Sequence, residues 1–352
     1  MRAPGATGKS RVSGASTLLT RLRQSHEAWL LAVIVAMGAL LGALAPGFLT
    51  IANFVDLLET YSVQGILALG LFVVLVSGGI DISFMATASV AQYLAAFLAA
   101  RWHWPGILCI PIGLATGIAL GCINATLIHF VRVTSIIATI ATMSVFFALL
   151  MYATGGKLIA DIPDWWSDRI VFAQWESADG DLVRINLPIV ALAVAALLTW
   201  LMMTRSNAGR QIYAMGGNPE SARRIGIRIG QLHYLVYGFL GFMAAAGGLL
   251  QAHRVGEAVP NALYGTELAV LSAAVLGGAS LSGGSGSVPG VLCGIVLLAI
   301  LQNGLNLMGV SPYFFQIVIG LVILIATSVM VLSSRRRRAP RARGEAEAPA
   351  GG

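Results

Sequence analysis

The amino-acid sequence predicts an all-α, polytopic membrane protein with about ten transmembrane helices. Three observations support this fold class. The 352 residues are 57% hydrophobic and only 11% charged, and the mean hydropathy of +0.82 is typical of membrane proteins rather than soluble domains. The apolar residues fall into segments of about 20 residues, the length that a helix needs to cross the bilayer. The basic residues gather between these segments and at the two ends of the chain.

Ten apolar stretches are predicted as spans, some of them only marginally long enough. In chain order they are roughly Ala28–Phe48, Val63–Gly79, Phe84–Ala100, Ile107–Phe130, Ile136–Thr154, Asn186–Met203, Leu232–Gln251, Leu268–Gly278, Val288–Leu307 and Tyr313–Leu332. The shortest, Leu268–Gly278, is predicted either to begin nearer Tyr264 or to be a broken helix. The first stretch has no clear small-residue cleavage site, so we expect a span rather than a removed signal peptide.

The positive-inside rule predicts that both ends of the chain lie in the cytoplasm. With alternating spans, 17 of the 22 Lys and Arg residues then fall on the cytoplasmic side. The five that fall outside are Arg101, Lys157, Arg169, Arg184 and Arg254. An odd number of spans would place the Arg-rich C-terminal tail outside. The predicted organisation is therefore a cytoplasmic tail over residues 1–27, a transmembrane domain over 28–332, and a disordered basic tail over 333–352.

Two outer segments are predicted to be more than connectors. Residues 50–60 place apolar side chains at helical spacing, which predicts a short helix in the outer interface. The longest outer loop, residues 155–185, carries Trp165, Trp166 and Trp175 among acidic residues. Such tryptophans either anchor a protein at the membrane interface or form a docking surface for an extracytoplasmic partner, and anchoring is the commoner role.

A basic, glycine-containing island, residues 205–228, lies between two predicted spans on the cytoplasmic side. Its second half has the residues that begin and end a short helix, namely Asn218, Pro219, Glu220, Arg223, Arg224 and Gly226. Asparagine caps helices, proline fits the first turn, and glutamate suits the positive end of the helix dipole. Arginines suit the last turn, and glycine can end the helix. We expect a helix of about two turns outside the membrane, which either docks a soluble partner or is a well-capped loop.

Two glycine-rich stretches interrupt the apolar pattern. Residues 77–83 separate the second and third predicted spans, and residues 277–287 join the eighth and ninth. Asp81 lies near the inner boundary, where it is either a functional group at membrane depth or, as we favour, an N-cap for a helix that starts at Ile82. The predicted gate or helix-break residues are Gly78, Gly79, Asp81, Gly277 and Gly278.

No catalytic, nucleotide-binding or metal-binding pattern is found in the sequence. The phosphate-binding pattern of Gly, four residues and Gly-Lys-Ser/Thr is absent. The three cysteines lie in apolar runs and offer neither a disulfide framework nor metal-ligand spacing. We therefore expect no cofactor and no metal. The charge of +7 lies in tails and loops, which argues against nucleic acid as a partner.

Polar amides within the predicted spans are candidates for a translocation path. They are Asn124, Gln302, Asn303 and Asn306. Amides can bind sugar hydroxyls, but they more often tie helices to one another. Asn303 and Asn306 are three residues apart and share a helix face.

Several stretches of the sequence are recognisable together. They are residues 74–83 (VLVSGGIDIS), 121–124 (GCIN), 139–143 (TIATM), 209–227 (GRQIYAMGGNPESARRIGI), 275–287 (VLGGASLSGGSGS) and 303–310 (NGLNLMGV). Through them the chain resembles the permease subunits of bacterial ABC importers for simple sugars, of the ribose, xylose and galactose type. It departs from the family pattern where Phe84 and Met85 follow Ser83, and where Thr134 and Ser135 replace a common proline.

The resemblance implies a permease of the bacterial inner membrane that imports a monosaccharide and has no ATPase site of its own. Its implied partners are a cytoplasmic ABC ATPase, a second permease chain that is identical or a sister, and a periplasmic sugar-binding protein. Membrane lipid is a further expected partner, because the basic run Arg335–Arg338 suits a contact with anionic lipid. The ATPase would bind a coupling helix that matches Asn218, Pro219, Glu220, Ala222, Arg223, Arg224 and Gly226. Two alternatives stay open: an ABC permease for a branched amino acid or a furanosyl signalling molecule, and an ion-coupled secondary transporter. The latter is disfavoured because no acid or base is clearly buried at mid-span.

Overall fold

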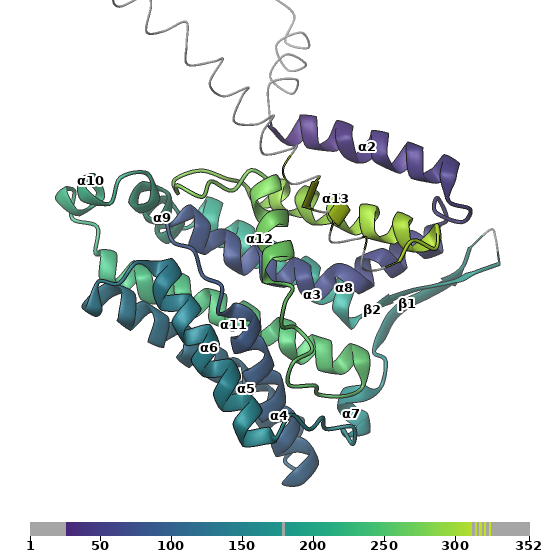
Figure 1. Ribbon diagram of the computed structural model, residues 1–352, viewed down its shortest axis with the longest axis horizontal. Coiled ribbons are helices and arrows are strands. Elements are labelled where there is room, and N and C mark those ends of the chain that lie inside the picture. Colours follow the sequence, from purple (N-terminus) through teal and green to yellow (C-terminus); the bar gives the residue numbers. More distant parts are fainter. Residues whose placement is uncertain are drawn as a thin grey trace, which may run out of the picture.

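The computed structural model describes residues 26–177 and 180–311, together with residues 314, 317, 318, 320, 321 and 324. Most of the tail over residues 1–27, the tail over 333–352 and most of the predicted span Tyr313–Leu332 lie outside the described residues. Within the described part the chain is mostly helical (Figure 1).

Nine of the ten predicted spans correspond to helices. They are α2 (His26–Leu44), α3 (Ile51–Val76), α4 (Phe84–Arg101), α5 (Gly106–Thr126), α6 (Ser135–Thr154), α8 (Leu187–Trp200), α11 (Ile229–Val255), α12 (Glu267–Leu276) and α13 (Val288–Leu307). The chain continues beyond α5 and α8 in two π-helical turns, η1 (Leu127–Val131) and η2 (Leu201–Arg205). Among the described residues, seven of these helical segments are long and apolar enough to cross a membrane; α4 and α12 are not among them. The protein is thus a polytopic membrane protein.

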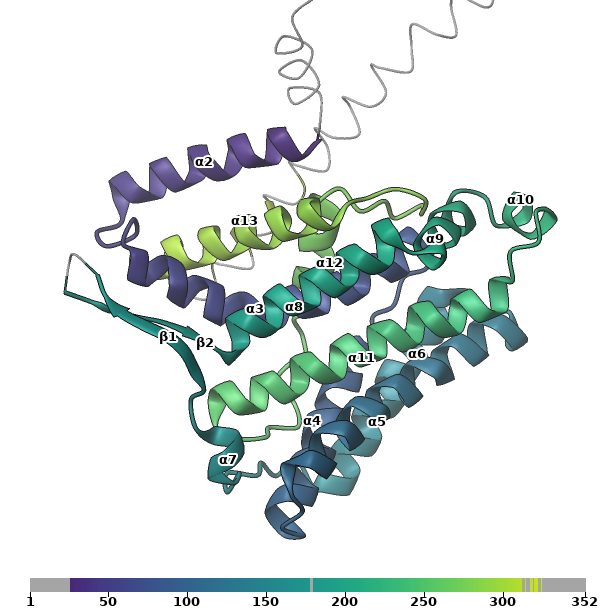
Figure 2. The same ribbon diagram turned by 180° about the vertical axis from the view of Figure 1, so that it is seen from behind.

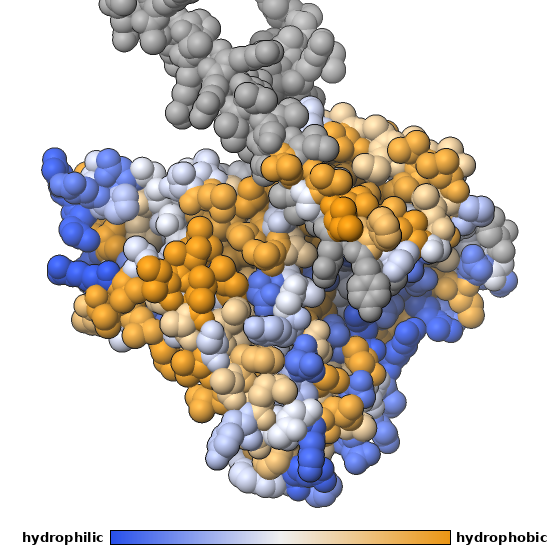
Figure 3. Space-filling model, viewed as in Figure 1, coloured by the Kyte–Doolittle hydropathy of each residue, from blue (hydrophilic) through white to orange (hydrophobic). Residues whose placement is uncertain are grey.

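The short elements lie at opposite ends of the helical body. The α10 end consists of α9 (Asn207–Gly217) and α10 (Pro219–Arg224). The hairpin end consists of α7 (Asp164–Ser167) and the antiparallel strands β1 (Val171–Glu176) and β2 (Leu182–Asn186). The two ends are far apart in both views (Figures 1 and 2). Apolar surface lies between hydrophilic patches at these ends, as expected where a bilayer surrounds the middle (Figure 3).

One prediction about the outer segments was wrong, and the all-α fold class needs a small correction. Residues 51–76 form one continuous helix, α3, instead of an interfacial helix followed by a separate span. The reason is that Leu57 packs with Leu41 and Phe48 in a buried cluster, so the first turns of α3 belong to the helical body. The outer loop over residues 155–185 contains a hairpin, which makes the fold not entirely α-helical.

Two helices, α3 and α11, form the centre of the described body, and most of their residues within membrane-length windows are buried. The glycines of α5 allow α11 to approach closely. A Cβ atom on Gly117 would lie 2.2 Å from the carbonyl oxygen of Gly241, which is too close for any side chain. Small residues at such crossings let helix backbones touch, and the van der Waals contact holds the helices together within a bilayer.

The broken helix predicted near Leu268–Gly278 is confirmed. Helix α12 has ten residues and is therefore about 15 Å long, roughly half of the bilayer core. It begins at Glu267, not at Tyr264, and an irregular segment over residues 256–266 precedes it.

Three chain segments meet backbone to backbone beside the α10 end, and we call this contact the glycine junction. The segments are residues 76–78 at the end of α3, Gly216 and Gly217 at the end of α9, and Gly283 and Gly284 between α12 and α13. The Gly284 N–H donates to the Val76 carbonyl oxygen over 2.8 Å. A Cβ atom on Gly216 would lie 1.8 Å from the same oxygen and 2.7 Å from the Gly284 nitrogen. No side chain fits between these segments.

Gly216→Ala is expected to destabilise the protein by about 1–3 kcal/mol, because the new methyl group must push the segments apart. Gly217→Ala is the matched control, since a Cβ atom there meets nothing within 4 Å. Both changes raise helix propensity equally. Thermal unfolding of the two variants in detergent measures the difference, and equal melting temperatures would show that the junction is not tightly packed.

Candidate functional site

Helix α10 has the beginning and end that the sequence predicts. The Asn218 side chain accepts a hydrogen bond from the Ser221 N–H over 2.9 Å, and Pro219 is the first helical residue. At the other end Gly226 has a φ of 87°, its N–H donates to the Arg223 carbonyl, and the Ile227 N–H donates to the Ala222 carbonyl. Two such hydrogen bonds around a glycine in the left-handed conformation are a common way for a helix to end.

The helix presents charged residues and one large apolar residue to the outside. Ala222 is the one buried residue of α10. Glu220 and Arg224 form an ion pair of 2.8 Å, but both side chains are about three-quarters exposed, so the pair contributes little to stability. Arg223 is exposed, and Ile225, directly after the helix, is 75% exposed. Arginine beside an exposed apolar side chain is typical of protein interfaces.

Helix α9 fixes α10 to the rest of the protein. Its N-cap Ser206 accepts from the Gly209 N–H, and its residues Ile212 and Met215 are buried in the main core. The Tyr213 hydroxyl donates to the Gly286 carbonyl oxygen over 2.9 Å. Burial raises the pKa of Tyr213, which keeps this hydroxyl protonated as a donor. A displacement of α10 is therefore expected to reach the loop between α12 and α13.

A buried polar cluster lies behind the turn between α3 and α4. Asp81 accepts hydrogen bonds from the N–H and the hydroxyl of Ser83, both over 2.7 Å. Asn124 of α5 donates to Asp81 over 3.2 Å and to the Ser83 hydroxyl over 2.7 Å, and it accepts from Thr142 of α6 over 2.7 Å. All four side chains are at least nine-tenths buried. The cluster thus joins the turn to α5 and α6 within the helical body.

The favoured interpretation of Asp81 as a helix cap was wrong. Helix α4 begins at Phe84, and its N-cap is Ser83, which makes no capping hydrogen bond with its side chain. Asp81 instead forms a local turn with Ser83 and reaches across to Asn124. The sequence did not reveal this because the partner lies 43 residues away.

The four predicted gate glycines lie in two turns of the same geometry. Gly78 and Gly278 have φ values of 88° and 91°, and each lies just after the end of a helix. In each turn the N–H of the glycine and the N–H of the next residue donate to carbonyl oxygens in the last turn of that helix. Gly78 belongs to the glycine junction, and Gly79 lies against the hydroxyl of Tyr237. Gly277 packs on the backbone of Gly290 in α13. Both turns thus end helices at the α10 end, and a gating role stays a prediction.

The path candidates on α13 are not brought together with Asn124. Asn303 exchanges two hydrogen bonds with Asn53 of α3, over 3.0 and 3.1 Å. Gln302 accepts from the Tyr61 hydroxyl over 2.7 Å, and Asn306 is exposed. In this conformation Gln302 and Asn303 tie α13 to α3, which is the commoner use of such amides.

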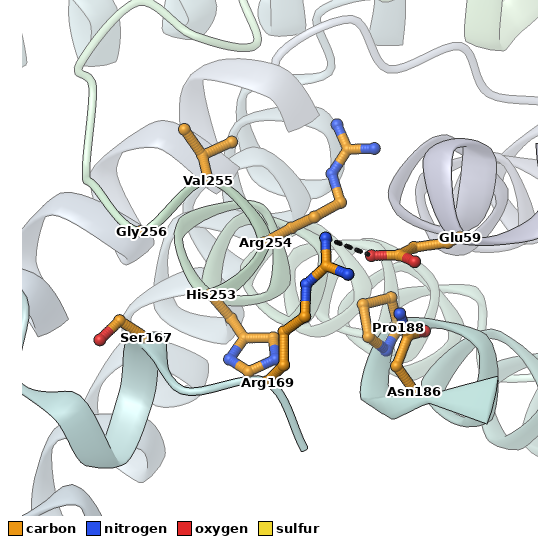
Figure 4. A pocket seen from close by; sticks show the side chains of 9 residues that line it. All are labelled: Glu59, Ser167, Arg169, Asn186, Pro188, His253, Arg254, Val255 and Gly256. Carbon is orange, nitrogen blue, oxygen red and sulfur yellow. Dashed lines mark ion pairs between the residues drawn. The ribbon is translucent and has the colours of Figure 1, made fainter. Parts of the chain in front are cut away.

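A polar pocket at the hairpin end was not predicted. Nine residues line its volume of about 130 Å³: Glu59, Ser167, Arg169, Asn186, Pro188, His253, Arg254, Val255 and Gly256 (Figure 4). Arg169 approaches Glu59 at 3.9 Å, and Arg254 donates to the Thr60 carbonyl oxygen. Among the described residues the buried Asn186 Oδ1 and Arg254 Nε have no hydrogen-bond partner. The sequence placed these charges outside but gave no sign that they meet.

Asn124→Ala is expected to lower stability by about 1–3 kcal/mol, because it leaves Asp81 and Thr142 short of buried hydrogen bonds. Asn306→Ala removes the same amide from an exposed position and should change little. Thermal unfolding in detergent compares the two variants. A melting temperature of Asn124→Ala equal to that of Asn306→Ala would mean that the cluster does not hold α5 and α6.

Comparison with known proteins agrees with the membrane architecture. Residues 53–327 match the family model described as branched-chain amino acid transport system / permease component. The chain is 32% identical over 319 residues to the ribose import permease protein RbsC of Escherichia coli strain K12. This alignment covers 87% of the present chain and 96% of RbsC. It is 32% identical over 320 residues to the galactose/methyl galactoside import permease protein MglC of Haemophilus influenzae, with 87% and 94% covered. It is 33% identical over 296 residues to the ribose import permease protein RbsC of Bacillus subtilis, and this alignment covers 84% of the present chain and 88% of RbsC. Because these matches cover most of the chain, the protein belongs to the branched-chain amino acid transport system permease family, as a membrane permease component.

Proposed function

We propose that this chain is the permease of an ABC importer for a monosaccharide such as ribose or galactose, and that a separate ATPase drives it through α10. The observation that carries the proposal is the match over 87% of the chain to relatives named as ribose and galactose import permeases. The family description names branched-chain amino acids, so such an amino acid is the main competing solute.

The proposed orientation puts the α10 end in the cytoplasm and the hairpin end in the periplasm. The basic residues of 205–228 support it under the positive-inside rule. The proposal counts ten spans, with both termini in the cytoplasm of an inner-membrane protein. This count includes α4, the half-length α12 and residues 313–332.

The proposed ATPase contact is the exposed surface of α10. Three features support it: the helix projects from the body, it exposes Arg223, Arg224 and Ile225, and α9 holds it firmly. A partner that bears carboxylates beside an apolar pocket would match this surface. ATP would be hydrolysed on that partner.

Displacement of α10 would reach the membrane through the glycine junction. The junction links α9 with the turn after α3 and with the loop after α12. The turn after α3 carries Asp81, whose cluster holds α5 and α6. Short, interrupted helices such as α12 commonly line substrate sites in transporters. We therefore infer that α12 and the turn after α3 move when access to the solute changes sides.

The periplasmic binding protein would deliver the solute at the hairpin end. Support comes from the polar surface there (Figure 3) and from the pocket with Arg169, Arg254 and Glu59. A second permease chain, identical or a sister, would complete the membrane part.

An ion-coupled carrier is the second candidate, because the structure removes one sequence argument against it. Asp81 and Glu267 are both buried, whereas the sequence indicated no clearly buried acid. The named relatives favour the importer. Uptake that a protonophore abolishes but ATP depletion leaves intact would instead establish the carrier.

Arg223→Glu combined with Arg224→Glu is expected to reduce solute uptake at least about tenfold, since like charges at an interface cost several kcal/mol. Membrane insertion should be unchanged because both side chains are exposed. The measurement is uptake of labelled ribose, galactose and leucine into cells, together with co-purification of the ATPase.

Arg184→Glu on the hairpin, a charge reversal at the opposite end of the protein, is the control and should retain ATPase binding. Normal uptake by the double variant would remove α10 from the mechanism. If the wild type takes up leucine but neither sugar, and the double variant loses this uptake, the sugar assignment is wrong but the ATPase contact at α10 stands.

A further inference from the structure

An apolar groove opens between α4 and α6 at the hairpin end. Its volume is about 650 Å³, within the range of small-molecule sites. Leu94 and Phe97 of α4 line one wall, Leu149 and Leu150 of α6 line the other, and Leu120 of α5 also borders it. Leu149 is 60% exposed, so the groove faces outward, where acyl chains can enter.

Two cations lie where the groove reaches the end of the helices. Arg101 is the last residue of α4, and Lys157 follows α6; both line the groove and are exposed. The Tyr93 hydroxyl donates to the Lys157 carbonyl oxygen over 3.0 Å, which ties the Lys157 loop to α4. No acidic residue lines the groove. In the described part of the chain neither cation forms an ion pair.

Aromatic residues indicate the depth of these cations in the membrane. Trp102 and Trp104 lie one and three residues after Arg101, and they are 58% and 36% exposed. The Trp102 ring lies edge-on to the Phe97 ring, with 5.9 Å between the ring centroids, and its centroid is 5.5 Å from that of the Trp104 ring. Exposed tryptophans gather at the level of lipid headgroups. We therefore expect Arg101 and Lys157 to lie at headgroup depth, with the apolar groove extending from them along α4 and α6.

We propose that this groove binds one anionic phospholipid, with an acyl chain along α4 and α6 and the phosphate between Arg101 and Lys157. Two uncompensated cations favour a headgroup of net negative charge over a zwitterionic one, whose ammonium they repel. A second copy of the chain fits less well, because a twofold contact with its axis at this end of the groove would bring the cations of both copies together. The proposal does not depend on which solute is transported.

Native mass spectrometry of the purified full chain with phosphatidylglycerol or phosphatidylethanolamine tests the proposal. The wild type is expected to retain one phosphatidylglycerol in preference to phosphatidylethanolamine. Arg101→Gln with Lys157→Gln should weaken that binding about 30-fold. Leu149→Trp, which fills the groove from an exposed position, should also release the lipid. Arg184→Gln with Arg228→Gln removes the same charge elsewhere and should change nothing.

Equal retention of the two lipids by the wild type, or equal binding of phosphatidylglycerol by the two double variants, would overturn the proposal. If Leu149→Trp disrupts dimers of the chain while phosphatidylglycerol stays bound, the groove belongs to a second copy and the proposal is wrong.

Discussion

The carbonyl oxygen of Val76 is the point on which the α10 end depends. It accepts a hydrogen bond from Gly284, and Gly216 lies against it with no room for a side chain. Backbone contacts of this kind have no flexible side chain that could absorb a movement. We therefore expect a force on α10 to be transmitted to the end of α3 and to the loop after α12. This constraint explains why glycines occur in three segments that are distant in the sequence.

From the junction, hydrogen bonds carry the connection into the helical body. Asp81, five residues after Val76, is held by Ser83 and Asn124, and Asn124 is held by Thr142. Each member is buried, so a broken bond leaves an unpaired polar group and costs more than the bond contributes. The cluster is thus suited to holding discrete arrangements of α3, α5 and α6.

Local features were predictable from the sequence. The caps of α10 are set by residues within nine positions of one another, and hydropathy alone located nine of the helices. The break at α12 was also visible, because the apolar run is too short for a span.

Features that depend on distant residues were not predictable. Residues 50–60 look like a surface helix in the sequence, but Leu57 is buried in one cluster with Leu41. Asp81 looks like a cap until Asn124 is placed beside it. The polar pocket needs Glu59 and Arg169, which are 110 positions apart in the sequence. The resemblance marked the stretches that meet at the junction, but nothing in a single sequence indicates which glycines touch.

The central claim is that α10 and the loop between α12 and α13 move as one unit. Spin labels at Arg224 and Ser282, both exposed, would measure the distance between them by electron paramagnetic resonance. The measurement would use the complete transporter, with and without a trapped nucleotide. We expect the same narrow distance distribution between positions 224 and 282 in both states, whereas labels at Arg224 and Arg132 should change their separation. A shift or broadening between positions 224 and 282 on nucleotide binding would contradict it.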